Sequence, residues 1–203
     1  MILACLDLEG VLLPEIWINV AEKTGISELR LTTRDISDYD QLMQYRLKIL
    51  KSRNITINHI TEVIDTLSPL PGAFDFLKKL QDHFQVIILS DTFYQFSMPL
   101  MKKLGHPTLF CHDLVVDGDH FISDYKLRIR DSKKNAIIKF RELNFKTIAS
   151  GDSYNDTSML AEADRGILFR PPDNVISEFP QYPVAKEYDE LWDEFLKAER
   201  ELG

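Results

Sequence analysis

The sequence predicts an α/β protein with a doubly wound, Rossmann-like parallel sheet and an inserted helical cap. Three observations support this fold class: short apolar runs recur along the chain, helical patterns lie between several of them, and a long helix-rich segment separates the first run from the second. The runs are rich in Ile, Leu and Val and do not alternate with polar residues, which is typical of strands covered on both faces.

The elements follow in a regular order. The expected strands cover residues 2–6, 86–89, 108–111, 147–149 and 166–169. Apolar residues at helical spacing predict helices around residues 73–80, 96–104 and 137–143, and an amphipathic helix around residues 188–196. This alternation of strand and helix indicates right-handed crossovers that build one parallel sheet.

The first two expected strands are separated by about eighty residues, far more than a crossover needs. This segment lacks a strong strand pattern, and apolar stripes at helical spacing run through residues 42–50 and 57–67. We therefore predict a helical cap at 14–70, inserted into a Rossmann-like core formed by 1–13 and 71–203. The turn-prone tripeptide Asp117-Gly118-Asp119 predicts a small antiparallel hairpin at about residues 113–129 within the core.

Composition indicates a globular protein and argues against several classes of partner. The chain of 203 residues is 44% hydrophobic and 28% charged, and its net charge of −8 argues against nucleic acid or an anionic membrane as the main partner. The two cysteines, Cys5 and Cys111, have neither disulfide-framework nor metal-binding spacing. No apolar run approaches the length of a membrane span and no basic leader precedes the first strand, so we expect a cytoplasmic protein.

Two carboxylates follow the first expected strand directly, in Asp7-Leu-Glu9-Gly10. Side chains two positions apart in a strand point to the same face, so Asp7 and Glu9 are expected to lie side by side. Ligands of open α/β sheets bind at the carboxyl ends of the strands. Two adjacent anions are unfavourable unless a cation, a proton or a reaction occupies the space between them, so the pair predicts an active site.

Three further polar features lie at strand or helix ends. They are Ser90 after the second run, a lysine at 133 or 134, and Gly151-Asp152-Ser153-Tyr154-Asn155-Asp156 after the fourth run. Each alone has an ordinary explanation as a helix cap, a surface lysine or a turn. In this order and placement, however, the chain resembles the haloacid dehalogenase superfamily of phosphatases, and the resemblance covers the whole core.

The resemblance implies catalysis through an aspartyl phosphate on Asp7, with Glu9 as general acid and then general base. The family usually has Asp at the position of Glu9, so the carboxyl group of this chain is carried on a side chain one methylene longer. A bound Mg²⁺ is implied, because oxygen ligands suit it and it neutralises phosphoryl charge. The implied metal ligands are Asp7, Glu9, Asp152 and Asp156. The implied substrate-binding residues of the core are Ser90, Asp91, Lys133 and Asn155. Only one of the adjacent lysines 133 and 134 can point inward, and Lys133 is preferred because it is the first lysine after Asp131.

The cap residues and the return to the core through Pro69-Leu-Pro-Gly72 resemble those of phosphoserine phosphatases. Arg46 is centred on an apolar helical stripe, where it needs a partner for its charge or must reach water with its head group. Glu15 follows Pro14 at an expected helix start, a place that favours an acidic residue in any case. The resemblance implies that Arg46 binds the carboxylate and Glu15 the ammonium of phosphoserine.

The second motif departs from most phosphoserine phosphatases, which have Ser-Gly-Gly where this chain has Ser90-Asp91-Thr92. This resembles a small bifunctional branch that also transfers the phosphoryl group to homoserine. Homoserine has one methylene more than serine, a difference worth only about 1–3 kcal/mol in a pocket. Phosphoserine and homoserine are therefore the expected small-molecule partners. Asp91 is left with two interpretations, a contact near the substrate or a hydrogen bond to the backbone.

Two alternatives are compatible with parts of this pattern. A phosphatase of the same superfamily could act on a sugar phosphate, a nucleotide or another small phosphometabolite. A phospho-acceptor signalling module also combines an acidic strand end, a Ser or Thr and a lysine, but it lacks a cap and the Asn155-Asp156 arrangement. No oligomeric state is predicted.

Overall fold

The protein, described by a computed structural model over residues 1–32, 35–36 and 38–203, contains a seven-stranded sheet of order β4-β3-β2-β1-β5-β6-β7 in these ranges. The strands are β1 (Ile2–Leu6), β2 (Gln85–Phe93), β3 (Leu109–Val116), β4 (Ile122–Lys126), β5 (Lys146–Gly151), β6 (Arg165–Phe169) and β7 (Val184–Ala185). Neighbouring strands are parallel apart from β3 and β4, which form an antiparallel pair.

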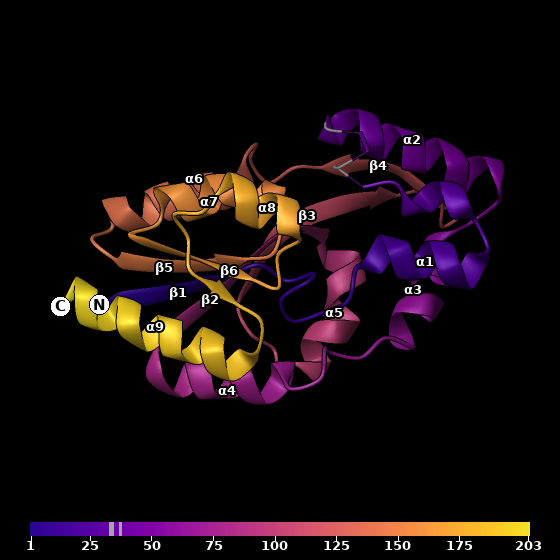
Figure 1. Ribbon diagram of the computed structural model, residues 1–203. Helices are drawn as coiled ribbons and strands as arrows, with labels where there is room; N and C mark the ends of the chain where they lie inside the picture. The colour runs from indigo at the N-terminus through magenta and orange to yellow at the C-terminus, as the bar shows by residue number, and fades with distance from the viewer. Residues whose placement is uncertain (33–34, 37) are drawn as a thin grey trace.

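Helices cover both faces of the sheet (Figure 1). One face carries α6 (Ser132–Glu142), α7 (Thr157–Glu162) and α8 (Asp173–Glu178), and the other carries α4 (Ala73–His83), α5 (Tyr94–Lys103) and α9 (Tyr188–Leu202). Along β1, Leu3 and Cys5 join one core cluster, whereas Ala4 and Leu6 join the other. Both faces of the strand are thus buried in apolar side chains, which explains why its sequence does not alternate. The predicted α/β class is confirmed.

The central strand β1 is the topological switch point of the sheet. From β1 the chain builds β2 and β3 on one side, and later β5, β6 and β7 on the other. The connections on the two sides diverge at the carboxyl ends of β1 and β5, which opens a crevice there. Asp7 and Asp152 follow directly after these two strands.

The segment between β1 and α4 is helical. It contains α1 (Ile16–Thr24), the 3₁₀ helix η1 (Ser27–Arg30), α2 (Tyr39–Ser52) and α3 (Ile57–Asp65). Figure 1 shows these helices beyond one end of the sheet, beside α5 and the β3–β4 pair. The Trp17 ring packs edge-on against Phe96 of α5, with the two ring centres 5.4 Å apart. The Ile57 amide donates a hydrogen bond to the His120 carbonyl in the β3–β4 turn. The division into a core of 1–13 and 71–203 and a cap of 14–70 stays a prediction.

Strand β2 differs from its expected form. The expected strand end at residue 89 is wrong, because β2 continues to Phe93 and includes Ser90. Leu89 pairs with Phe110 but Phe93 pairs with His112, so the segment between them is longer in β2 than in β3. The extra residues form an irregularity of the kind that redirects side chains beside active sites. Strand β3 also runs further than expected because it pairs with β4, and the short β7 was not predicted.

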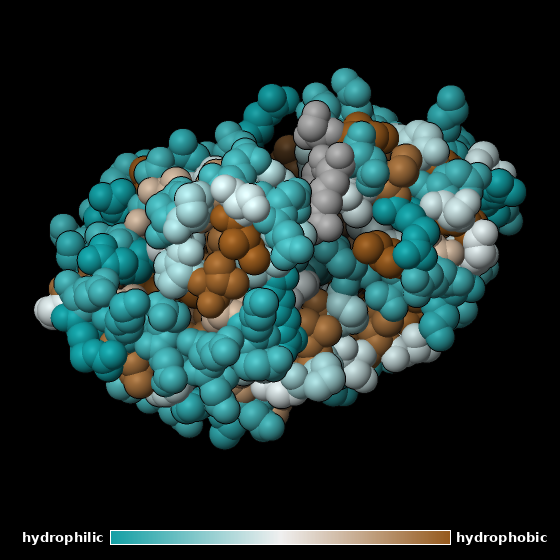
Figure 2. Space-filling model, viewed as in Figure 1, coloured by the Kyte–Doolittle hydropathy of each residue, from teal (hydrophilic) through white to brown (hydrophobic). Residues whose placement is uncertain are grey.

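The face of the molecule in Figure 2 is mostly hydrophilic, with apolar side chains in small separate areas. Among the helices of the described ranges, none has both the length and the apolar character that a bilayer crossing requires.

Candidate active site

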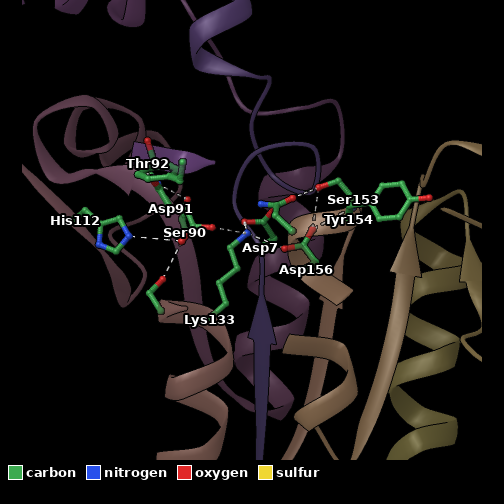
Figure 3. A network of polar contacts seen from close by, with 12 residues as sticks. Asp7, Ser90, Asp91, Thr92, His112, Lys133, Ser153, Tyr154 and Asp156 are labelled. Carbon is green, nitrogen blue, oxygen red and sulfur yellow. Dashed lines mark hydrogen bonds and ion pairs between the residues drawn. The ribbon is translucent and has the colours of Figure 1, made fainter. Parts of the chain in front are cut away.

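Several polar side chains meet at the carboxyl ends of β1, β2 and β5 and at the first turn of α6 (Figure 3). They line a cavity of about 940 Å³ that also reaches residues of α1 and α2. All of the predicted site residues except Asp156 line this cavity. They are Asp7, Glu9, Glu15, Arg46, Ser90, Asp91, Lys133, Asp152 and Asn155. Asp156 is completely buried beneath this cavity.

Lys133 joins two buried carboxylates. Its Nζ donates to Asp7 Oδ1 at 2.8 Å and to Asp156 Oδ1 at 2.7 Å, and all three side chains are at most 6% exposed. Burial alone lowers the pKa of Lys133, but Asp156, Asp7 and Asp91 raise it well above its usual range. Lys133 is therefore a fixed cation at the bottom of the cavity.

Its neighbour Lys134 lies at the rim of the cavity and pairs with a different carboxylate. Lys134 Nζ lies 3.3 Å from Glu162 Oε1, and its side chain is 42% exposed. The start of α6 thus directs one of the two lysines inward and the other to the surface, because successive residues of a helix point in directions about 100° apart. The geometry agrees with the preference for Lys133 as the inward lysine.

Asp7, Asp152 and Asp156 form an acidic cluster. One carboxylate oxygen from each lies within 4.8 Å of the other two. Burial raises the pKa of Asp7, and Asp156 and Asp152 raise it further, whereas Lys133 lowers it. The donor set consists of oxygen atoms and holds three carboxylates against one lysine, so it fits a hard divalent cation such as Mg²⁺.

The main chain comes unusually close to this cluster. Gly10 has a φ of +79°, and a Cβ atom there would lie 2.5 Å from the Asp152 carboxyl group. A Cβ on Gly151 would similarly lie 2.3 Å from the Asp156 carboxyl carbon. Glycine at both positions is therefore needed for the carboxylates to lie where they do.

Asp156 holds the loop after β5 in place. Its Oδ2 accepts hydrogen bonds from the Asp152 and Ser153 amides at 3.0 and 3.1 Å. Asn155 does not reach the bottom of the cavity: it is exposed, and its Oδ1 accepts a hydrogen bond from the Ser153 hydroxyl. The structure therefore places Asn155 at the rim of the cavity and Asp156 in the acidic cluster beneath it.

Glu9 lies outside the strand geometry from which its position was expected. Strand β1 ends at Leu6, and the chain turns at Gly10, so the side-by-side arrangement of positions i and i+2 in a strand does not apply. Glu9 Oε2 accepts a hydrogen bond from the Ile16 amide at 2.8 Å and so caps α1. Asp7 and Glu9 both line the cavity, but among the described residues Glu9 is not a member of the acidic cluster that contains Asp7.

The environment of Glu9 suits proton transfer. Burial raises the pKa of Glu9 to about 7, with a further increase from Glu15, although the hydrogen bond from Ile16 and the charge of Arg46 lower it. A carboxyl group with a pKa near 7 can serve both as an acid and as a base near neutral pH.

Arg46 is buried in the cap side of the cavity. Its Nη2 donates to the Leu31 carbonyl at 2.7 Å, and its guanidinium carbon lies 4.5 Å from the centre of the Trp17 ring. Burial lowers the pKa of Arg46 to about 10, while Tyr39, Glu9 and Glu15 raise it. Among the described residues, its Nε is buried and has no hydrogen-bond partner. The guanidinium thus has a donor that no acceptor in this part of the chain satisfies.

Glu15 occupies the N-cap position of α1 but makes no capping hydrogen bond with its side chain. Glu9 makes that bond instead, so the ordinary helix-start explanation does not account for the Glu15 carboxylate. Glu15 and Arg46 both line the cavity, which brings an anion and a cation together above Asp7 and Lys133.

Sequence reasoning missed a group of residues around Asp91. Ser132 Oγ donates to Asp91 Oδ1 at 2.9 Å, His112 Nε2 lies 3.5 Å from the same oxygen, and the Tyr39 hydroxyl donates to the Asp91 carbonyl at 2.9 Å. These residues come from α6, β3 and α2. Neither spacing nor motif marks them, because only the fold brings the three elements to one point. Asp91 itself, left with two interpretations above, has its side chain in the cavity.

Comparison with known proteins identifies the family of the chain and agrees with the fold. A family model of haloacid dehalogenase-like hydrolases matches residues 3–164. A phosphoserine phosphatase of Pseudomonas syringae pv. tomato is 58% identical over 201 residues, covering 98% of this chain and 85% of that protein. The phosphoserine phosphatase ThrH of Pseudomonas aeruginosa is 57% identical over 198 residues, covering 98% of this chain and 97% of that protein. The chain belongs to the haloacid dehalogenase-like hydrolases, as the sequence motifs predicted.

Solved structures share the fold. A phospho-aspartyl intermediate analogue of phosphoserine phosphatase has a TM-score of 0.77 at 21% identity, covering 95% of this chain and 97% of that one. A substrate-bound phosphoserine phosphatase complex has a TM-score of 0.74 at 21% identity, covering 91% and 92% of the two chains. At this identity the likeness concerns the fold alone.

Proposed function

We propose that the protein is a Mg²⁺-dependent phosphoserine phosphatase that works through an aspartyl phosphate on Asp7 and also transfers the phosphoryl group to homoserine. Two relatives at 57% and 58% identity that carry the name phosphoserine phosphatase support the first activity. The observation that carries the proposal is that one cavity holds both the buried Asp7–Lys133 pair and the Arg46–Glu15 pair. The first pair suits a phosphoryl group, and the second suits an amino-acid zwitterion.

In the first step, an Asp7 carboxylate oxygen attacks phosphorus, and the bond from phosphorus to the serine oxygen breaks. Lys133 and Ser90 hold the phosphoryl oxygens as charge shifts onto them. Glu9 donates its proton to the departing serine oxygen, so serine leaves as a neutral alcohol and Glu9 is left ionised.

In the second step, Glu9 takes the proton of a water molecule or of an acceptor alcohol, whose oxygen attacks phosphorus. The bond between Asp7 and phosphorus breaks, which regenerates the Asp7 carboxylate and releases phosphate or a new phosphate ester. Glu9 is protonated again at the end of the cycle, so the same side chain serves both steps.

Asp7 and Asp152, with Asp156 beside them, are the residues that would hold Mg²⁺, and the Glu9 side chain is left out of this set because it caps α1. A bound divalent cation would neutralise negative charge that the nucleophile and the phosphoryl group bring together. Asp156 already accepts from Lys133 and from two amides, so its main role in this proposal is to orient the others.

Arg46 and Glu15 would select the substrate. The free Nε donor of Arg46 would bind the α-carboxylate, and the Glu15 carboxylate would bind the ammonium group. Homoserine carries the same two groups with one more methylene, which a pocket discriminates by only about 1–3 kcal/mol. Homoserine can therefore replace water in the second step when the cavity admits it. We place the enzyme in the cytoplasm, in serine and threonine metabolism.

Phosphate release from phosphoserine tests the proposal. We expect Mg²⁺-dependent release by the wild type and none by Asp7→Asn, which keeps the shape of the side chain but removes the nucleophile. Release without Asp7, or no release from phosphoserine by a folded wild type with Mg²⁺, contradicts it. Turnover of another small phosphometabolite in place of phosphoserine would favour the alternative substrate class within the same family.

A further inference from the structure

The proposed mechanism gives no role to Asp91, a charged residue of the cavity close to Lys133. Its side chain is 32% exposed and extends from the irregular part of β2 towards α6. Its Oδ1 accepts from Ser132 and lies near His112, whereas Oδ2 lies 3.9 Å from Lys133 Nζ. One carboxylate oxygen is thus fixed by the protein, and the other faces the ammonium group.

The contacts of His112 define its role. Its Nδ1 accepts a hydrogen bond from the Arg128 amide at 3.1 Å, so the ring hydrogen is on Nε2, which faces Asp91. The ring is 3% exposed and packs against Phe93 and Tyr39. His112 is therefore a fixed donor directed at one oxygen of Asp91.

Asp91 is held in its ionised form by these neighbours. Burial alone raises the pKa of Asp91, but Lys133 and the hydrogen bonds from His112 and Ser132 lower it well below its usual range. The anion next to Lys133 is thus built by three different elements, β2, β3 and α6.

The position of Asp91 relative to Asp156 explains why an anion is useful there. In Figure 3 the two carboxylates lie on opposite sides of the Lys133 ammonium group, with Asp7 between them. When Asp7 becomes esterified it loses its negative charge, and Asp156 alone would then draw the ammonium group away from the phosphoryl oxygens. A second anion on the other side balances this attraction.

We propose that Asp91, oriented by His112 and Ser132, is a positioning residue that holds the Lys133 ammonium group against the phosphoryl group throughout the cycle. This role rests on the proposed phosphoryl transfer to Asp7 but not on the identity of the substrate. Most phosphoserine phosphatases have Gly at this position, so the arrangement depends on the Ser90-Asp91-Thr92 form of the second motif.

Two variants of His112 separate positioning from structure. His112→Phe keeps the ring and its aromatic contacts but removes the donor, whereas His112→Gln keeps an N–H donor at a similar reach. With nitrophenyl phosphate as substrate, we expect His112→Phe to lower kcat by about ten- to a hundredfold, the usual effect of losing a residue that orients a catalytic group. His112→Gln should retain most of the activity. Wild-type activity in folded His112→Phe overturns the proposal.

A double-mutant cycle with Asp91→Asn gives the second test. If His112 acts through the Asp91 carboxylate, adding His112→Phe to Asp91→Asn should change kcat by no more than about twofold. The proposal is overturned if the loss of kcat in the double variant equals the product of the losses in the two single variants. It is also overturned if Asp91→Asn has wild-type kcat. Thermal unfolding of each variant identifies loss of folding, and Asp91→Asn decides the question on its own if His112→Phe does not fold.

The aryl phosphate also separates this inference from the proposed function. A wild type that hydrolyses nitrophenyl phosphate but not phosphoserine would contradict the proposed substrate and leave the cycle measurable. If the wild type never forms a phosphoenzyme, both the proposed mechanism and the positioning role of Asp91 are contradicted.

Discussion

Lys133 donates one hydrogen bond to Asp7, after the first strand, and another to Asp156, in the loop after the fifth. The first contact joins residues 126 positions apart in the chain, and the second joins residues 23 positions apart. They form between buried side chains, so the ammonium group both compensates the carboxylates and faces the space where a phosphoryl group would bind.

Lys133→Met should abolish phosphatase activity and destabilise the fold, because it leaves two buried carboxylates without their cation. Removing one partner of a buried pair typically lowers the free energy of unfolding by about 3–5 kcal/mol. Urea unfolding and phosphate release measure the two effects. Lys139→Met, in the same helix, is the matched control: its side chain is 66% exposed and pairs with Glu142 at the surface, so both quantities should stay close to wild type. Equal losses in the two variants would contradict the assignment of Lys133.

Glu9→Gln should separate the two chemical steps. Loss of general acid catalysis should slow phosphoserine turnover by about 10²–10⁴-fold. Nitrophenyl phosphate has a good leaving group and needs little acid assistance, so this variant should still form phosphoenzyme from this substrate. Hydrolysis of that phosphoenzyme should be slow, because it needs Glu9 as a base. Rapid-quench measurement should show a burst of nitrophenol that matches the enzyme concentration. Steady turnover without a burst would contradict the role of Glu9 in the second step.

The pH dependence of wild-type turnover should reflect the same side chain. The first step needs protonated Glu9, so its rate should fall as pH rises through about 7, the raised pKa of this group. The second step needs ionised Glu9, so its rate should fall as pH drops below about 7. Single-turnover measurements of phosphoenzyme formation and decay should show these opposite limbs, and Glu9→Gln should lack both.

Arg46→Ala should weaken the recognition of phosphoserine and leave the rates of the chemical steps nearly unchanged. Its guanidinium is the buried cation of the cavity's cap side, so we expect a large loss of kcat/KM for phosphoserine and little change for nitrophenyl phosphate. Loss of a charged hydrogen bond corresponds to about 1.5–3 kcal/mol, or roughly ten- to a hundredfold. Arg53→Ala, at the end of the same helix and paired with Glu28 at the surface, is the control. Parallel losses on both substrates would indicate a structural role for Arg46.

Mg²⁺ should stabilise the folded protein through the acidic cluster. A ligand present at a hundred times its Kd adds about 2.7 kcal/mol to the free energy of unfolding. The thermal unfolding midpoint of wild type should therefore rise with Mg²⁺ and fall back with a chelator, whereas Asp152→Asn should show a much smaller rise. Asp119→Asn, in the exposed β3–β4 turn, should respond as wild type does. An undiminished response of Asp152→Asn would exclude Asp152 as a ligand.

Phosphohomoserine should form when the enzyme turns over phosphoserine in the presence of homoserine. Because both acceptors attack the same phosphoenzyme, more homoserine should raise phosphohomoserine and lower inorganic phosphate by equal amounts. Phosphorus NMR of the reaction mixture measures both products. Release of phosphate that is insensitive to homoserine would remove the transfer activity from the proposal and leave the hydrolase.

The sequence by itself determined the fold class and the site's main members. The apolar runs identified buried strands, because a strand covered on both faces must be apolar along its length. The carboxyl ends of parallel strands meet at one edge, so Asp7 and Asp152 were expected to lie close, and the acidic cluster has them together.

Only the tertiary structure decided where the remaining polar groups point. Strand periodicity does not set the direction of Glu9, because the strand ends at Leu6 and the Glu9 carboxylate turns to the Ile16 amide. Trp17 beneath Arg46 and His112 beside Asp91 carry no local signal, since each meets its partner from a distant element. Local sequence patterns encode secondary structure and burial, whereas contacts between elements depend on packing that no short segment contains.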